Sequence, residues 1–162
     1  MTPAGPSDAA ELAALHNAVA DRLTQEHGRG HWSYRTTERG VLRALQISRV
    51  FRLRQRGTIV ATFTLQTRKP WAIDVSYFTP VARPVYLIAL AVDPSAQGKG
   101  LGHRMIDTAI FEAKAWPADA IRLDAYDTAA GASPFYAACG FRERGRVKYR
   151  GTPLRYFEML LS

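Results

Sequence analysis

The sequence predicts one α/β domain (in the broader sense, α+β) over residues 1–162, and three observations support this prediction. First, the apolar run Val85–Val92 is typical of a strand buried on both faces. Second, a glycine-rich turn at Gln97–Gly102 separates that run from a helical segment, His103–Ala115. Third, strand and helix patterns of ordinary length fill the rest of the chain, without a linker, repeat or low-complexity region. A chain of 162 residues is long enough to bury a substantial core.

The first half of the chain predicts two helices followed by a hairpin. Ser7 or Asp8 can cap a helix that runs to about Gln25 and has one apolar face. A second, short helix is predicted from Thr36 or Thr37 to about Leu45. Two segments rich in β-branched and aromatic residues then flank an Arg-Gly turn, which indicates a hairpin over 48–55 and 58–67.

The second half alternates strands with helices. The segment 68–84 contains prolines among aromatic residues and predicts irregular chain around a short strand near 73–78. Beyond the glycine-rich turn and its helix, residues 121–126 predict a strand and residues 131–139 a short helix that Gly140 ends. Two closing antiparallel strands are expected over 141–148 and 154–161.

Composition narrows the classes of protein that the chain can belong to. The single cysteine, Cys139, has no partner for an internal disulfide, and its apolar surroundings in the sequence indicate a small core residue. No apolar stretch approaches the roughly 18 residues of a membrane span, and the first residues lack the pattern of a secretory signal. The histidines and the cysteine show no metal-binding spacing. We therefore expect a cytoplasmic protein without a metal or a membrane partner.

The formal net charge of +8 is high for this length and would attract polyanions, including a phosphorylated cofactor. The basic residues are spread along the chain, and in Arg52–Arg56 they alternate with other residues as on the wet face of a half-buried strand. This distribution does not favour nucleic acid as the partner.

The turn between the predicted strand and helix has the properties of an anion site. Its glycines allow the backbone to approach a ligand closely, and the first N–H groups of a helix have no acceptor within it. These donors and the positive end of the helix dipole favour a phosphate or pyrophosphate group. We expect a phosphorylated ligand at residues 97–103.

Two motifs in this order resemble the GCN5-related N-acetyltransferase (GNAT) superfamily. The first is Gln97-Gly-Lys-Gly-Leu-Gly102 after the fourth strand, and the second ends in Tyr136-Ala-Ala-Cys-Gly140-Phe141. The resemblance covers nearly the whole chain. It implies a mixed, mostly antiparallel central sheet of about six to seven strands, flanked by about four helices, whose fourth and fifth strands splay apart.

The resemblance also implies that acetyl-CoA is the acyl donor. The pantetheine arm would pair with strand backbone at Leu90, Ala91 and Val92, and an N–H near Val92 would polarise the thioester carbonyl. The pyrophosphate would lie over the turn, which comprises Gln97, Gly98, Lys99, Gly100, Leu101 and Gly102, with His103 at the start of the helix. Lys99 would contribute its charge, although an exposed, solvated lysine is an equally good interpretation.

The resemblance assigns an acid more clearly than a base. Tyr136 matches the tyrosine near the CoA sulfur and is the candidate general acid toward the thiolate. Some relatives carry a glutamate base early in the fourth strand, but this position holds Tyr86 here. Asp124, on the fifth strand, is a weak candidate for the base, and the base stays unassigned. Five further residues are candidates for the base: Asp74, Tyr77, Glu26, His27 and His31.

The acceptor is expected to be a primary amine of a small molecule or peptide. The positive net charge disfavours strongly cationic acceptors, because like charges repel. The aromatic residues Trp32, Trp71, Tyr77 and Phe78 would either line an acceptor pocket or cap the core. Many relatives are dimers, and the closing strands 141–161 could support a homodimer. The alternative function is a non-catalytic acyl-CoA-binding or sensor protein on the same fold.

Overall fold

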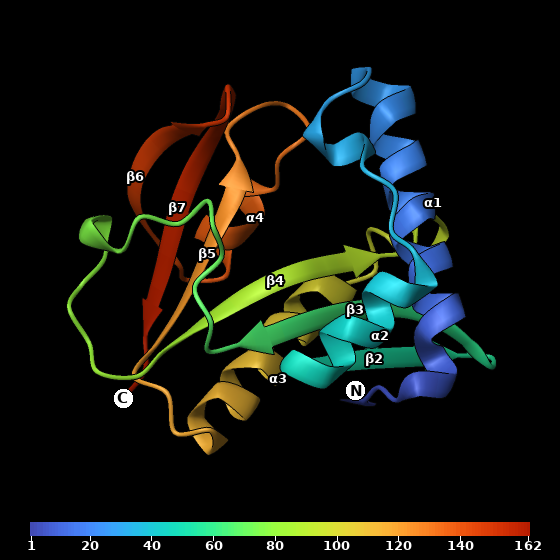
Figure 1. Ribbon diagram of the computed structural model, residues 1–162, viewed down its shortest axis with the longest axis horizontal. Coiled ribbons are helices and arrows are strands. Elements are labelled where there is room, and N and C mark those ends of the chain that lie inside the picture. The colour runs from blue at the N-terminus through green and yellow to red at the C-terminus, as the bar shows by residue number, and fades with distance from the viewer. The chain divides into compact units, whose positions relative to one another are not determined.

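The computed structural model describes residues 1–162, and its elements follow the predicted order (Figure 1). The strands are β1 (Thr2–Pro3), β2 (Arg49–Gln55), β3 (Thr58–Gln66), β4 (Pro84–Val92), β5 (Ala120–Tyr126), β6 (Arg142–Tyr149) and β7 (Thr152–Leu160). The helices are α1 (Ala9–His27), α2 (Glu38–Ile47), α3 (Leu101–Ala115) and α4 (Ser133–Ala138). Short 3-10 helices occupy Pro6–Asp8, His31–Ser33, Val75–Tyr77 and Pro94–Ala96. None of the helices combines the length and the apolar character that a membrane span requires.

The seven strands are hydrogen-bonded in the order β1-β2-β3-β4-β5-β7-β6. The β1–β2, β2–β3, β5–β7 and β6–β7 pairs are antiparallel, whereas β4 and β5 run parallel. The parallel pairing covers only Pro84–Tyr86 against Ala120–Arg122, although both strands continue beyond it. The predicted mixed sheet with four helices is therefore confirmed.

Two compact units divide the chain. Unit 1 comprises residues 1–66 and 88–109, and unit 2 comprises residues 67–87 and 110–162. The strand β4 contributes its first residues to unit 2 and its last residues to unit 1. The expectation of one domain over 1–162 stays a prediction.

Unit 1 packs its two long helices on a hairpin. The core joins Leu12 and Leu15 of α1, Val41 of α2 and the strand residues Val50 and Ile59. The predicted helix start is confirmed for α2, where the Thr37 hydroxyl accepts a hydrogen bond from the Gly40 N–H at 3.0 Å. At α1 the Asp8 carboxylate does not cap the helix; it bonds instead to the Gly5 N–H and to two arginines.

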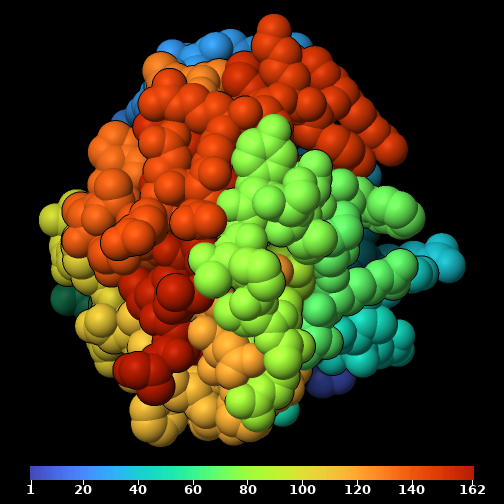
Figure 2. All heavy atoms as spheres, turned by 90° about the vertical axis from the view of Figure 1, so that its left-hand side faces the viewer, coloured from blue at the N-terminus to red at the C-terminus, as the bar shows by residue number.

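Unit 2 contains the β5–β7–β6 sheet, α4 and the long connection formed by residues 67–83. Leu123 and Phe157 lie opposite each other on β5 and β7, and both are buried. The predicted strand near 73–78 is wrong, because residues 75–77 form a 3-10 helix that Asp74 caps. A proline-rich segment with few partners for its N–H groups adopts a turn more readily than a strand. Figure 2 shows this connection (green) lying against the β6–β7 hairpin (orange to red).

Candidate active site

The glycine-rich turn lies in unit 1, between the end of β4 and the start of α3. The Asp93 carboxylate accepts hydrogen bonds from the Ser95 N–H at 2.9 Å and the Ser95 hydroxyl at 2.6 Å, which fixes the 3-10 turn after β4. The Gln97 amide donates to the Val92 carbonyl at 3.1 Å and closes the turn. Residues 97–100 are exposed, and Leu101 begins the helix with its side chain in the core.

Gly98 and Gly100 give this turn an open backbone surface. Their φ angles are 76° and 79°, a region that residues with a Cβ rarely adopt. No heavy atom lies within 4 Å of the position that a Cβ would take at either glycine. The N–H groups of the first turn of α3 have no acceptor inside the helix. The turn therefore leaves room for an anionic ligand beside the N-terminus of α3.

The end of β4 departs from the predicted fully buried strand. Its first residues, Val85–Leu87, are buried, but Ile88 and Leu90 are only partly buried and Ala89 is exposed. Ala89 also has a φ of 51°, which is strained for a residue with a Cβ. Of the three predicted cofactor-pairing residues, Ala91 is buried, whereas Leu90 and Val92 are partly accessible. Irregular, accessible strand backbone of this kind is common beside active sites.

Tyr136 lies in unit 2, on α4, with its ring packed among Phe135, Phe141 and Phe157. Only 8% of the residue is exposed, and its hydroxyl makes no hydrogen bond within the chain. Burial, together with the charge of Asp124, raises the pKa of the Tyr136 hydroxyl. Tyr136 therefore keeps its proton at neutral pH and can act as a donor.

Asp124 is a partly buried carboxylate on β5 that no other residue neutralises. Burial raises its pKa, and the hydrogen bond that it receives from its own backbone only partly offsets this effect. Its negative charge also raises the pKa values of three tyrosines, Tyr126, Tyr136 and Tyr156. A desolvated carboxylate without a counter-ion is unusual unless it serves a chemical purpose.

Ser133, at the first position of α4, carries a buried hydroxyl oxygen without any hydrogen-bond partner. Buried hydroxyl groups are nearly always bonded, so this one is available to a ligand. It precedes Tyr136 by one helical turn, which places both side chains along one side of α4.

The structure places the other base candidates in structural or exposed roles. Tyr86, at the position of the missing glutamate, is buried and accepts a hydrogen bond from the Arg122 guanidinium at 3.4 Å. Glu26 pairs with Arg22 on the surface of α1, and His27 and His31 are exposed. Asp74 and Tyr77 are also exposed and belong to the connection 67–83.

The four aromatic residues predicted either to line an acceptor pocket or to cap the core do not all behave alike. Phe78 is 4% exposed and belongs to the core, whereas Trp71 and Tyr77 are 82% and 39% exposed. Trp32 donates its indole N–H to the Gly28 carbonyl at 2.8 Å and stays partly exposed in unit 1. Cys139 is partly exposed rather than a core residue, because Gly140 ends α4 directly after it.

Sequence reasoning missed Tyr156, which lies directly opposite Asp124 in the β5–β7 pair. Opposite residues of an antiparallel pair point to the same face of the sheet, so the two side chains are neighbours. The Tyr156 hydroxyl accepts a hydrogen bond from the Asp74 N–H at 3.1 Å and donates to the Ala72 carbonyl. Only the register of the last strand could have revealed this pairing.

Comparison with protein-family models agrees with the fold and the two motifs. The model of the acetyltransferase (GNAT) family matches residues 13–141, most of the chain. The chain therefore belongs to the GNAT acetyltransferase family. Members of this family bind acetyl-CoA or CoA, and the protein is accordingly an enzyme of the N-acetyltransferase class.

Solved structures share the whole fold at low sequence identity. An N-acetyltransferase from Staphylococcus aureus Mu50 is 18% identical, with 99% of this chain and 96% of that chain covered (TM-score 0.74). YncA from Salmonella typhimurium, solved with acetyl-CoA, is 19% identical over 99% and 92% (TM-score 0.72). The ribosomal-protein-S18-alanine N-acetyltransferase from Escherichia coli is 17% identical over the same shares (TM-score 0.73). No curated protein matches the sequence.

Proposed function

We propose that this GNAT enzyme transfers an acetyl group directly from acetyl-CoA to a primary amine of a small molecule or peptide. The observation that carries the proposal is the pair formed by Asp124 and Tyr136 in unit 2. One is a partly buried carboxylate without a counter-ion, and the other is a buried phenol without a hydrogen-bond partner. Amine acylation needs an acceptor for one proton and a donor of another, and these two groups supply both.

The residues of the chain fit acetyl-CoA. The backbone N–H groups of residues 97–103 would hold the pyrophosphate, where Gly98 and Gly100 leave open space. The exposed backbone near Leu90 would pair with the pantetheine arm, and the orphaned hydroxyl of Ser133 is free to accept or donate a further hydrogen bond. Acetyl-CoA would supply an acetyl group activated as a thioester.

Proton transfer would use the two unpartnered groups of unit 2. The Asp124 carboxylate would accept a proton from the ammonium form of the acceptor, so that the nitrogen reacts with its lone pair free. Burial raises the pKa of Asp124, which makes its carboxylate a stronger base. As the amine nitrogen bonds to the acetyl carbon and the carbon–sulfur bond breaks, the Tyr136 hydroxyl, which keeps its proton at neutral pH, would donate that proton to the departing CoA sulfur.

The first test is a calorimetric titration of the protein with acetyl-CoA, with NADH at the same salt concentration as a specificity control. We expect micromolar binding of acetyl-CoA, no binding of NADH, and at least a hundredfold weaker acetyl-CoA binding in Gly100→Glu. A carboxylate at residue 100 would fill the open turn and repel the pyrophosphate. Gly28→Glu is the matched control, because Gly28 has nearly the same φ, 80°, and equally open surroundings. Absence of acetyl-CoA binding would refute the proposal.

A second measurement separates the enzyme from a sensor of acyl-CoA. We expect release of free thiol when a panel of primary amines is added with acetyl-CoA. A sensor would bind acetyl-CoA with the same affinity and release no thiol with any amine.

A further inference from the structure

Unit 2 contains a long connection between consecutive strands that, unlike the other long links of the chain, carries no α-helix. The β2–β3 and β6–β7 hairpins each close through an Arg-Gly pair with positive φ angles, whereas residues 67–83 join β3 to β4. Long connections within a compact fold are usually functional. This segment is also rich in exposed aromatic side chains, which a simple link does not need.

Several contacts fix this connection onto the β6–β7 sheet. The Arg144 guanidinium donates to the Tyr77 carbonyl at 3.2 Å, and the Tyr156 hydroxyl bonds to the backbone of Ala72 and Asp74. A Cβ at Gly145 would clash with the Tyr77 ring, so the absence of a side chain there seats that ring. The connection is therefore held in a defined position.

A second anchor of the connection is a buried ion pair. The Arg122 guanidinium bonds to the Glu158 carboxylate at 3.1 Å and to the Thr79 carbonyl at 2.6 Å. Glu158 in turn accepts a hydrogen bond from the Thr79 N–H at 3.2 Å, and the Arg122 guanidinium lies over the Phe78 ring. The end of the connection is thus tied to β5 and β7 from both sides.

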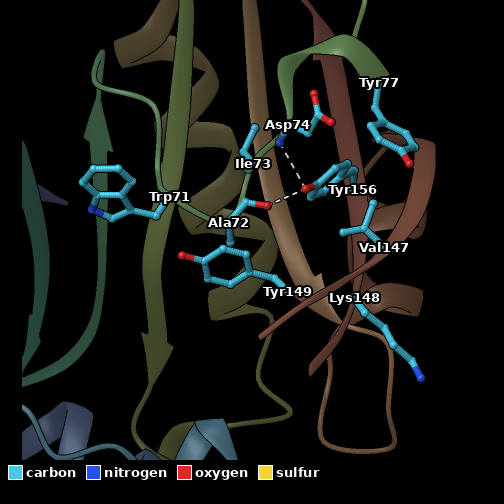
Figure 3. Close-up of a pocket in the computed structure, with 9 residues that line it drawn as sticks. All are labelled: Trp71, Ala72, Ile73, Asp74, Tyr77, Val147, Lys148, Tyr149 and Tyr156. Atoms are coloured by element: carbon cyan, nitrogen blue, oxygen red, sulfur yellow. Dashed lines mark hydrogen bonds between the residues drawn. The ribbon is translucent and has the colours of Figure 1, made fainter. Parts of the chain in front are cut away.

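Between the connection and the β6–β7 hairpin lies a groove of about 420 Å³ (Figure 3). It is lined by Trp71, Ala72, Ile73, Asp74, Tyr77, Val147, Lys148, Tyr149 and Tyr156. The lining combines four aromatic side chains with one carboxylate. This volume suits a small organic molecule or the end of a peptide.

The carboxylate of Asp74 is held ionised, and only one of its two oxygens accepts hydrogen bonds from the chain. One of its oxygens accepts hydrogen bonds from the Ser76 N–H at 3.0 Å and the Ser76 hydroxyl at 2.7 Å. These bonds, the hydroxyl first, lower the pKa of Asp74, and the positive charge of Lys69 adds to the effect. The other oxygen accepts no hydrogen bond within the chain. A negative charge with a free oxygen is thus fixed at the groove.

The rings of the groove favour the same kind of ligand. The side chains of Trp71 and Tyr77 are exposed to solvent, although large aromatic rings are usually buried. The face of an aromatic ring attracts a cation, most strongly for tryptophan. The exposed Tyr77 ring beside the Asp74 carboxylate, with Trp71 on the other side of the groove (Figure 3), therefore defines a site for an ammonium or guanidinium group.

Three cationic side chains belong to or contact the groove's walls. Two of them hydrogen-bond elsewhere, and the third points away from Asp74. Lys69 donates to the carbonyls of Pro70 and Ile73 at 2.9 and 2.7 Å. Arg144 is turned to the Tyr77 carbonyl and the Glu158 carboxylate. The Lys148 ammonium points away from Asp74 (Figure 3). None of the three donates a hydrogen bond to the Asp74 carboxylate, and Lys69 acts on it through its charge alone.

Tyr156 links this groove to Asp124. Its backbone lies opposite Asp124 on the neighbouring strand, while its hydroxyl contacts the Asp74 N–H. The charges of both aspartates raise the pKa of Tyr156, after the larger effect of burial. Both carboxylates therefore lie close enough to Tyr156 for their charges to act on its hydroxyl.

We infer that the groove binds the cationic end of an amine acceptor that carries two basic nitrogens a few bonds apart. Asp74 and the rings would hold one nitrogen in its charged form, and the second nitrogen would reach Asp124 for acetylation. This inference rests on the proposed function. It reverses the expectation from net charge, because the charge within the groove, rather than the total of +8, determines which ligand fits.

The test compares 1,4-diaminobutane with 1-butylamine. Because Trp71 lines the groove, we expect the diamine to quench tryptophan fluorescence at a concentration at least tenfold lower than the monoamine. The quenching should disappear in Trp71→Phe, which leaves Trp32 and Trp116 as silent background. With acetyl-CoA, the diamine should give at least a tenfold higher kcat/KM in thiol release than the monoamine.

Two variants assign the effect to the groove. Asp74→Asn should remove the preference for the diamine in both assays, and Gly145→Ala should weaken it by displacing the Tyr77 ring. Asp107→Asn, at an exposed position on α3, is the matched control and should keep the preference. Equal binding of the two amines, or an unchanged preference in Asp74→Asn, would overturn the inference.

Failure of the inference is distinguishable from failure of the proposed function. If both amines are acetylated equally well, the proposed acetyltransferase activity is supported and the assignment of the groove is refuted. If no amine releases thiol while the diamine still quenches Trp71, the groove binds cations and the acetyl transfer falls.

Discussion

Asp8 in unit 1 and Asp124 in unit 2 are both shielded from water, but the surroundings of their carboxylates differ. Asp8 is 4% exposed and accepts hydrogen bonds from the Gly5 N–H at 2.9 Å and from Arg54 and Arg52 at 2.8 and 3.3 Å. The Gly5 bond, supported by the two arginines, lowers the pKa of Asp8 against the opposing effect of burial. Asp124 has no such partners, and burial raises its pKa.

The difference separates a structural carboxylate from a candidate functional one. The network around Asp8 ties the first turn of the chain to β2, and every strong donor near it is used. The Asp124 carboxylate instead has no charged partner within the chain, so a ligand can pair with it, and its burial lowers the free energy of unfolding at neutral pH. Strained or underused groups of this kind concentrate at sites where a protein acts on something else.

The largest effect on stability is expected from Asp8→Asn. An amide would lose the charge that Arg52 and Arg54 face, and we expect the free energy of unfolding at pH 7 to fall by about 2 kcal/mol. Because the folded state lowers the pKa of Asp8, its stabilisation is present above the unfolded value near 3.8 and is lost as the pH falls through the folded value. Urea denaturation between pH 2 and pH 7 measures this. Asp21→Asn, in an exposed pair with Arg35, should change stability by less than about 0.5 kcal/mol, and an equal loss in both variants would contradict the comparison.

A smaller change in the free energy of unfolding, of opposite sign, is expected from Asp124→Asn. The folded state raises the pKa of Asp124, so its stabilisation is present below the unfolded value near 3.8 and is lost as the pH rises through the folded value. The amide therefore raises the free energy of unfolding at pH 7 and has little effect in acid. In the same variant we expect kcat/KM to fall by about 10²-fold or more, because the proton acceptor is removed. Loss of stability at pH 7, or full activity, would show that Asp124 is structural as Asp8 is.

The smallest effect on stability is expected from Tyr136→Phe. The hydroxyl has no partner to lose, and the ring keeps its packing, so the free energy of unfolding should change by less than about 1 kcal/mol. We nevertheless expect kcat to fall by about 10²-fold, with acetyl-CoA affinity unchanged, if the phenol is the proton donor. Calorimetry and thiol release on the same preparation measure both quantities. An unaltered kcat would reassign the donor, with Tyr126 as the next candidate on the preceding strand.

Local patterns predicted the elements that depend on neighbouring residues. The helix at Thr37, the Arg-Gly turn at residues 56–57 and the glycine-rich turn before α3 all follow from side-chain capping or from positive φ angles within a few residues. The order of these elements and the two motifs led to the family, which the family model confirms. The strand expected near 73–78 failed because the Asp74 side chain caps a 3-10 helix over Val75–Tyr77.

The helices, most of the strands and the turn at residues 97–103 could be predicted from the sequence, because their backbone conformation depends largely on residues that are near in the chain. Tertiary structure decided which polar groups have partners. Asp8 is neutralised by two arginines that lie about 45 residues away in the chain. Asp124 has no such partner, so burial raises its pKa. The groove likewise exists only because the β5–β7 and β6–β7 registers bring Tyr156 and Val147 beside Asp74, and a register is set by pairing between distant strands.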